Sequence, residues 1–89
     1  MRRIERTSAF KREKRGRHGK SLDSDLRAVV TLLATDQALP RNRFDHPLVG
    51  EWRDHRDCHI KPDLVLIYRK PDSETLQLVR LGSHSELGL

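Results

Sequence analysis

Residues 64–68 read Leu-Val-Leu-Ile-Tyr, a short and nearly continuous apolar run between two turn-forming segments. A run of this length is typical of a β-strand that is covered on both faces. The segment before it is Lys61-Pro62-Asp63 and the segment after it is Pro71-Asp72-Ser73, and both are rich in residues that favour turns. The stretch therefore predicts a central strand with a close neighbour on either side.

The two neighbouring strands are predicted from alternating polarity. Residues 51–60 alternate imperfectly around Trp52, and residues 75–81 (TLQLVRL) are rich in β-forming types. Two short turns between three strands imply an antiparallel meander. Residues 2–6 (RRIER) alternate weakly and are expected to form a short first strand.

Two helices are expected before the meander. A cap at Thr7 or Ser8 begins a helix that runs to about Arg17. Ser21 is expected to cap a second helix, in which apolar residues recur at helical spacing and form one stripe: Leu22, Leu26, Val29, Val30 and Leu33. The sequence thus predicts one α+β domain over residues 1–89, with both helices covering one face of a small antiparallel sheet.

The positive charge is concentrated at the N-terminus. The net charge is +5, yet residues 1–20 alone contain nine Lys or Arg and only two Glu. Such a block attracts polyanions, since each phosphate that it neutralises releases a counterion. The alternative is a solvated helix face that keeps a small protein soluble. Four residues of this block are candidates for RNA contact: Lys11, Arg12, Lys14 and Arg15.

The cellular compartment is suggested by what the sequence lacks. The lone Cys58 excludes an internal disulfide and fits a reducing compartment. No apolar run approaches the ~20 residues that a membrane span needs. The basic N-terminus also lacks the apolar stretch of a signal peptide. We therefore expect a cytoplasmic protein with no membrane partner.

Histidines are concentrated in the second half of the chain, where the meander is predicted. If residues 52–60 are extended, His55, Asp57 and His59 share one face of the sheet. Arg80 and His84, at the end of the last strand, could then approach the end of the hairpin that carries His59 and Asp63. An alternative is that these are surface polar residues of a half-exposed sheet.

This set of residue types suits cleavage of an RNA phosphodiester. Imidazoles can donate or accept a proton near neutral pH, and a guanidinium stabilises charge on a phosphate. No nucleophilic Ser or Cys is evident, and in RNA the 2′-hydroxyl supplies the nucleophile. A zinc site made of Cys58, His59 and Asp63 is disfavoured, because adjacent strand residues point to opposite faces and the paired ligand spacings are missing. We expect no metal and no cofactor.

Other polar and aromatic residues of this half have simpler explanations. Asp57 and Arg56 could form an ion pair at the sheet edge, of little energetic weight. Trp52 and Tyr68 are expected to pack in the core rather than to stack on bases.

Four motifs then follow in a fixed order. Residues 45–52 read DHPLVGEW, residues 56–63 read RDCHIKPD, residues 64–68 read LVLIY and residues 80–84 read RLGSH. In this order and spacing they resemble the YafQ branch of the RelE/ParE toxin superfamily, and the two upstream helices fit as well. The resemblance covers essentially the whole chain. It implies a RelE-like fold, a small twisted antiparallel sheet with two N-terminal helices on one face.

The resemblance also implies a function. Such proteins are toxins of type II toxin–antitoxin systems that cleave mRNA in the ribosomal A site and are held inactive by a cognate antitoxin. The partners would be the antitoxin, the ribosome with its rRNA, and mRNA, and operator DNA is a candidate ligand of the toxin–antitoxin complex. The active site that the resemblance implies comprises His46, His59, Asp63, Arg80 and His84.

Each of these residues has an implied role. His84 would protonate the leaving 5′-oxygen. Either His46, or His59 working with Asp63, would take the proton from the 2′-hydroxyl. Arg80 would stabilise charge on the scissile phosphate.

The tail departs from the family pattern. Relatives commonly carry an aromatic residue shortly after the last histidine, and Gly88 stands at that position here. Leu87 or Leu89 would then have to contact the mRNA base in its place. Base–aromatic stacking is worth roughly 1–3 kcal/mol, so its loss would lower activity about tenfold or more.

Two other functions compete with this reading. The first is a non-catalytic protein of the same fold that acts by binding, as the ParE side of the superfamily acts on DNA gyrase; the acid–base residues argue against it. The second is a plain RNA-binding module that uses the basic block, which leaves the histidines unexplained.

Overall fold

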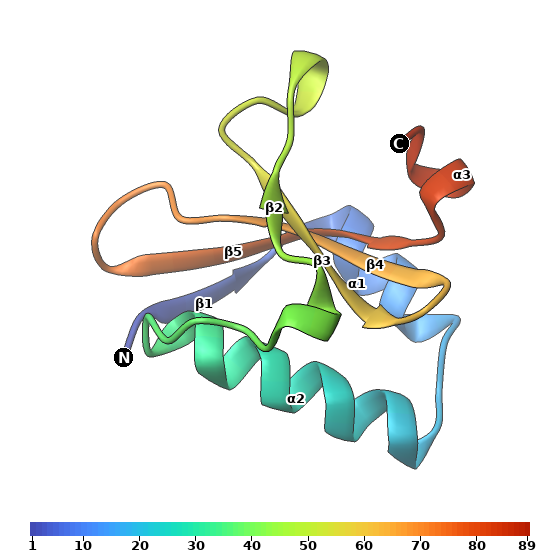
Figure 1. The fold of residues 1–89 in the computed structure, drawn as a ribbon. Helices are drawn as coiled ribbons and strands as arrows, with labels where there is room; N and C mark the ends of the chain where they lie inside the picture. The colour runs from blue at the N-terminus through green and yellow to red at the C-terminus, as the bar shows by residue number, and fades with distance from the viewer.

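The computed structural model describes residues 1–89 and shows a five-stranded sheet with helices on both faces (Figure 1). In chain order its elements are β1 (Arg3–Arg6), α1 (Ser8–Arg15), α2 (Lys20–Ala34), the 3₁₀ turn η1 (Arg41–Arg43), β2 (His46–Pro47), the 3₁₀ turn η2 (Gly50–Trp52), β3 (Arg56–Lys61), β4 (Leu64–Arg69), β5 (Thr75–Gly82) and α3 (His84–Leu87).

The strands lie in the order β1-β5-β4-β3-β2. The predicted meander is confirmed, because β3, β4 and β5 pair antiparallel in sequence order. The first strand pairs with β5 in parallel, so the sheet is mixed and the prediction of a purely antiparallel sheet is corrected at this edge. Helices α1 and α2 carry the chain away from β1, and the meander then returns β5 to it in the same direction.

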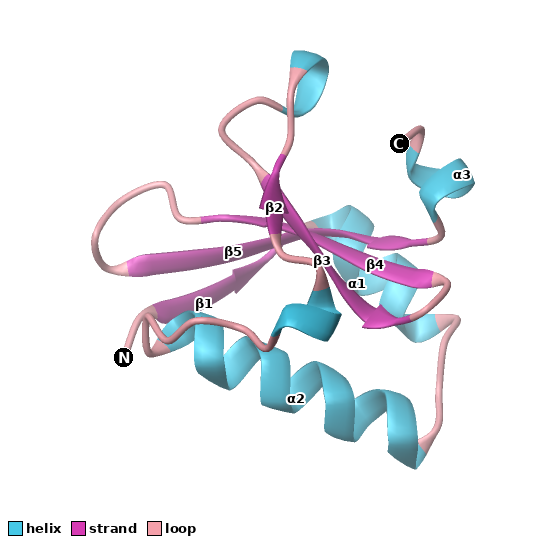
Figure 2. Cartoon of the chain, viewed as in Figure 1, coloured by secondary structure: helices cyan, strands magenta, loops and turns pink.

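The central strand is covered on both sides, as its apolar sequence predicts. Leu66 and Tyr68 belong to the main core beneath α1 and α2, which also contains Phe10, Leu22, Val29, Leu33, Cys58, Ile60, Leu76, Leu78 and Leu81. Val65 and Ile67 face the other way and pack against Leu87, with Leu48, Trp52 and Val79 around them. Figure 2 shows α2 on one side of the sheet, with α3 and the loop that carries η2 on the other. No helix is both long and apolar enough to cross a membrane.

The helices begin near their predicted caps. Thr7 caps α1, since its hydroxyl accepts a hydrogen bond of 3.0 Å from the Phe10 N–H. Helix α2 starts one residue before the predicted cap, Ser21, because Gly19 turns the chain with a φ of 131° and α2 begins directly after it. Ser21 lies inside the helix, where its hydroxyl contacts Lys61.

The largest differences from prediction lie in the second half. The strand predicted over residues 51–60 is shorter, because η2 occupies its start and Asp54 adopts a positive φ of 70°. As a result Trp52 lies on the same face of the sheet as Asp57, not on the opposite face as alternation would require. Strand β2 and helix α3 were not predicted.

The end of β5 is held by a carboxylate of α1. Strand β1 pairs only with residues 75–78, so the edge of β5 beyond them has no strand partner. Glu13 covers this edge: it accepts hydrogen bonds from the Leu81 N–H at 3.1 Å and from Arg80 Nε and Nη2 at 3.0 and 2.8 Å. Although desolvation by burial opposes them, these hydrogen bonds hold the pKa of Glu13 below its ordinary value.

We expect Glu13→Gln to destabilise the fold by about 1–3 kcal/mol, since it weakens a charge-assisted pair and disturbs a part-buried backbone donor. Urea unfolding at neutral pH measures this. Because the folded pKa is lowered, the contribution is present above the ordinary Glu value and is lost as pH falls through the folded pKa. The wild type and the variant should therefore converge in acid. Glu5→Gln, which removes an exposed pair with Arg3, is the control and should change stability by less than about 0.5 kcal/mol.

Candidate active site

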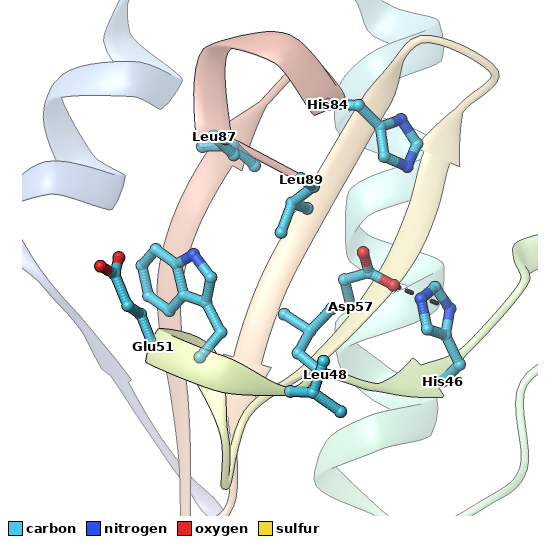
Figure 3. Close-up of a pocket in the computed structure, with 10 residues that line it drawn as sticks. His46, Leu48, Glu51, Asp57, His84, Leu87 and Leu89 are labelled. Atoms are coloured by element: carbon cyan, nitrogen blue, oxygen red, sulfur yellow. Dashed lines mark ion pairs between the residues drawn. The ribbon is translucent and has the colours of Figure 1, made fainter.

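Three histidines and one aspartate meet on the face of the sheet opposite α1 and α2. His46 comes from β2, Asp57 and His59 from β3, and His84 from the start of α3. The His59 and His84 rings lie 5.1 Å apart between centroids, and His46 Nδ1 lies 2.9 Å from Asp57 Oδ1. Figure 3 shows His46 and His84 on different sides of the Asp57 carboxylate. The structure thus brings together His46, His59 and His84 of the predicted set.

The orientation of His46 follows from two acceptors at one ring nitrogen. Pairing of β2 with β3 places His46 directly opposite Asp57. Its Nδ1 donates to the Phe44 carbonyl at 2.8 Å, with Asp57 Oδ1 close by. Because both neighbours accept, Nδ1 carries the hydrogen, and in the neutral imidazole the lone pair is on Nε2. Half of the His46 side chain is exposed, so this ring can act as a base toward a bound molecule.

Asp57 is a buried carboxylate, with 1% of its surface exposed. Its Oδ1 makes no hydrogen bond of good geometry, so its attraction to His46 is electrostatic. Burial raises the pKa of Asp57, while the neighbouring His46, His84 and His59 act in the opposite direction. The predicted edge pair with Arg56 is wrong, because Arg56 binds Asp45, at 3.2 Å.

Asp45 fixes the chain just before His46. It accepts hydrogen bonds from the Tyr68 hydroxyl at 2.7 Å and from Arg56 Nε at 3.2 Å. Tyr68 is buried, as predicted for a packing residue, and burial together with this hydrogen bond raises its pKa, so the hydroxyl stays a donor. The core is therefore linked to the site through Tyr68 and Asp45.

Helix α3 presents His84 as its first residue. Ser83 and Glu86 form a reciprocal capping box, with the Ser83 Oγ accepting from the Glu86 N–H at 3.1 Å and Glu86 accepting from the Ser83 N–H at 2.7 Å. Glu86 also pairs with Arg17 at 2.6 Å, which ties α3 to the segment that follows α1. These contacts hold a helix of only four residues in place.

The tail turns back over the site at Gly88. Its φ of 72° is left-handed, a conformation that glycine adopts without strain, and the Leu89 N–H donates to the His84 carbonyl at 2.9 Å. Leu87 is 5% exposed and packs against Val65 and Ile67, although it also lines the pocket beside His84, so its contact with RNA stays a prediction. Leu89 is the exposed leucine of the tail, and it lines the pocket beside His84 (Figure 3).

The remaining predicted residues lie outside this cluster. Asp63 is exposed in the turn between β3 and β4 and lines neither the pocket that contains His84 nor the one that contains His59. Arg80 does not line the pocket, and its Nε and Nη2 are bound to Glu13. His55 precedes β3, where its ring packs edge-on against Trp52 with 5.3 Å between the ring centroids, and it does not line the pocket that contains His46 and His84.

Residues 2–88 match the family described as the bacterial toxin of type II toxin–antitoxin systems, YafQ. The chain belongs to the YafQ family. Its relatives include the mRNA interferase toxin YafQ of Escherichia coli K12, 41% identical over 63 residues, or 70% of this chain and 67% of that protein. The putative toxin YafQ of Haemophilus influenzae is 50% identical over 54 residues, or 57% of this chain, so the match spans about half of that relative, 53%.

Solved structures resemble this YafQ-family chain over nearly its full length. A copper-bound mutant toxin from Helicobacter pylori has a TM-score of 0.86 and 37% identity, covering 98% of this chain and 99% of the other. YafQ in the E. coli DinJ–YafQ toxin–antitoxin complex has a TM-score of 0.78 and 33% identity, covering 97% and 96%. The fold that the sequence motifs implied is therefore confirmed.

In this YafQ-family toxin, Cys58 belongs to the core and not to the site. Its side chain is fully buried beneath the helices, on the face opposite His59, and burial raises its pKa to about 12. No group of three or more His, Cys, Asp or Glu side chains is arranged to hold a metal ion.

The basic block is divided between free and paired side chains. Lys11, Arg12 and Arg15 are exposed on α1. Lys14 is less exposed and pairs with Asp23 of α2 at 2.9 Å. Three of the four basic residues predicted to bind RNA are therefore free to meet a polyanion.

Proposed function

We propose that this toxin is an endoribonuclease that cleaves mRNA in the ribosomal A site by metal-independent acid–base catalysis. The observation that carries the proposal is a pair of exposed imidazoles, His46 and His84, beside one buried carboxylate, with the His46 ring held through its Nδ1. The name of the E. coli relative, an mRNA interferase, supports the same reaction. A surface used only for binding has no need of a buried charge that holds one ring nitrogen.

The proposed reaction is a transesterification. His46 Nε2 takes the proton from the 2′-hydroxyl, and the 2′-oxygen then forms a bond to the adjacent phosphorus. The bond from phosphorus to the 5′-oxygen breaks, and protonated His84 donates its proton to that oxygen. The products carry a 2′,3′-cyclic phosphate and a 5′-hydroxyl. Each proton transfer is worth typically about 10²–10⁴-fold in rate.

His59, Arg80 and Asp63 have supporting roles in this proposal. His59 lies against His84 and would position it or bind the phosphate. Arg80 keeps its Nη1 without a protein partner, and we assign to it the stabilisation of phosphate charge. Asp63, which is exposed in the turn after β3, would act through contacts with the RNA.

The partners follow from the same reading. We assign to the toxin a cognate antitoxin, as in the DinJ–YafQ complex, and the ribosome with its rRNA and bound mRNA. We also assign the protein to the cytoplasm, where these partners would be found. Binding of operator DNA is proposed for the toxin–antitoxin complex and not for the toxin alone.

The exposed cations of α1 should contact ribosomal RNA through its phosphates. Replacing Lys11, Arg12 and Arg15 together by Ala should weaken ribosome binding and reduce the slope of log affinity against log salt by about one for each phosphate that is no longer neutralised. Sedimentation of toxin with ribosomes over a range of salt concentrations measures both quantities. The control is Arg27→Ala with Arg41→Ala, which removes exposed cations outside the basic block. An unchanged slope in the triple variant would exclude α1 from the interface.

The function is tested by mapping RNA ends in a translating extract to which purified toxin is added. We expect new 5′-hydroxyl ends inside codons of translated messages, and none when initiation is blocked. Growth arrest without cleaved mRNA would contradict the proposal and favour a ParE-like binding mechanism, which inhibition of DNA gyrase would reveal directly.

A further inference from the structure

One aromatic side chain beside the site is exposed rather than buried. Phe44 keeps 62% of its surface accessible, while the other Phe, Phe10, keeps 2%. Neither the core nor the proposed acid–base chemistry uses the Phe44 ring. A large exposed apolar side chain next to a binding site commonly marks a contact with a ligand.

The backbone of Phe44 is strained, which makes a phenylalanine at this position costly. Its φ and ψ of 50° and 42° are left-handed, and the other non-glycine residues with positive φ are both aspartates, Asp36 and Asp54. Asp and Asn adopt this conformation far more readily than a bulky residue. Strained residues of this kind cluster at functional sites, where the surrounding structure holds them in place.

The strained turn joins Phe44 to two of the three site histidines. Its carbonyl accepts the hydrogen bond from His46 Nδ1 at 2.8 Å. Its ring lies 5.2 Å from the His59 ring, which in turn lies 5.1 Å from His84. Any residue in this backbone conformation could offer its carbonyl to His46, whereas the ring contact requires an aromatic side chain.

The surface around the ring is suited to a nucleotide. Phe44 and His59 border a hollow that is also lined by Asn42, Arg43 and Lys61. Arg43 and Lys61 lie 3.6 and 2.6 Å from the same carboxylate, Asp25, so this hollow keeps a net positive charge. The exposed Phe44 ring is therefore surrounded by cations that can bind a phosphate and by the Asn42 amide, which can form hydrogen bonds with the edge of a base.

We propose that Phe44 is a stacking platform for a nucleobase next to the scissile phosphate. The proposal rests on the nuclease function and assigns a substrate-binding residue to it. It gives the toxin an aromatic contact on the His59 side of the site, while the tail, with Gly88 and Leu89, offers none. Stacking of a base on an aromatic side chain tolerates any base, so Phe44 would add affinity without specifying sequence.

The test compares three variants in the mRNA cleavage assay. Phe44→Asn keeps the left-handed backbone and its carbonyl but removes the ring, and should lower kcat/KM about tenfold to a hundredfold, mainly through KM. Phe44→Tyr keeps the ring and should retain activity. Phe44→Leu keeps an apolar side chain without a π-face and should behave like Phe44→Asn.

A second readout is independent of catalysis. Ribosome-bound messages that carry 2-aminopurine on one or the other side of the cleavage site should lose fluorescence when the inactive His84→Ala toxin is added. The double variant, with Phe44→Asn as well as His84→Ala, should no longer quench the fluorescence at one of these two positions. Thermal unfolding of Phe44→Asn should show unchanged or higher stability, which separates loss of stacking from loss of fold.

The outcomes distinguish the two proposals. If the wild type cleaves mRNA and Phe44→Asn cleaves it with the same KM and the same quenching, the platform is refuted and the nuclease stands. If the wild type does not cleave translated mRNA, the nuclease function is refuted, and with it the role given to Phe44. Retained activity in Phe44→Leu with loss in Phe44→Asn would also overturn stacking, since apolar contact alone would then suffice.

Discussion

His46→Ala and His84→Ala should each lower the rate of mRNA cleavage by about 10²–10⁴-fold while the protein stays folded. His46 is the ring whose Nδ1 is held by protein acceptors, so its Nε2 is the proton acceptor, and His84 is the exposed ring across Asp57. Both side chains are exposed, so neither substitution opens a cavity in the core. Single-turnover cleavage on programmed ribosomes measures the rate, and circular dichroism checks the fold.

The rate losses of His46→Ala and His84→Ala should not multiply in the double variant. Because both rings act in one displacement, the double variant should be only slightly slower than either single variant. His18→Ala and His55→Ala are controls, since His18 lies between α1 and α2 and His55 packs on Trp52, and both should cleave at the wild-type rate. Full activity in His46→Ala would move the role of base to His59.

Asp57→Asn should lower cleavage by about a hundredfold, because it removes the charge that stabilises His46 after His46 has taken a proton. The loss should be smaller than that of His46→Ala, since the Phe44 carbonyl still holds the Nδ1 hydrogen. The free energy of unfolding, unlike the cleavage rate, should not fall in Asp57→Asn. Burial raises the pKa of Asp57, so its ionised form costs free energy in the folded state.

The raised pKa of Asp57 determines how the stability of the folded protein changes with pH. Between the ordinary Asp value and the raised folded pKa, the folded state binds more protons than the unfolded chain, so wild-type stability falls as pH rises through this interval. Asp57→Asn should lack this fall and be at least as stable as the wild type at neutral pH. Urea titrations at several pH values measure it.

Asp63→Asn is the matched control for Asp57→Asn. Asp63 is exposed and lines neither pocket that contains a site histidine, so its substitution should leave stability unchanged and lower cleavage less. A larger loss of activity in Asp63→Asn than in Asp57→Asn would return the supporting role to the carboxylate that the sequence motif suggested.

Local patterns were sufficient to predict most of the fold. The apolar run at residues 64–68 and the turns on either side of it predicted the meander, and the stripe from Leu22 to Leu33 predicted α2. The capping box at Ser83 and Glu86 was also readable, and it would have predicted α3. The parallel pairing of β1 with β5 joins segments some seventy residues apart, and no local pattern encodes it.

The site was harder to predict, because burial and pairing decide the role of a charged residue. The alternation of residues along β3 correctly placed Asp57 and His59 on one face of the sheet. The position of His46 opposite Asp57, and the burial of that carboxylate, follow from the pairing of β2 with β3, which the sequence did not predict. The contacts of Arg80 could not be predicted either, because Glu13, which binds two of its nitrogens, lies 67 residues earlier in the chain. Leu87 is the buried residue of α3, and its inward direction could be inferred only once that helix was recognised.

Strand β3 carries the core on one side and the site on the other, and this ties its length to function. Cys58 and Ile60 face the helices, whereas Asp57 and His59 face the opposite surface. Deleting or inserting a single residue inside β3 would exchange these sets, moving a carboxylate and an imidazole into the apolar interior. The spacing between Asp57 and His59 is therefore fixed by the architecture itself, because the same strand must supply the core on one face and the site on the other.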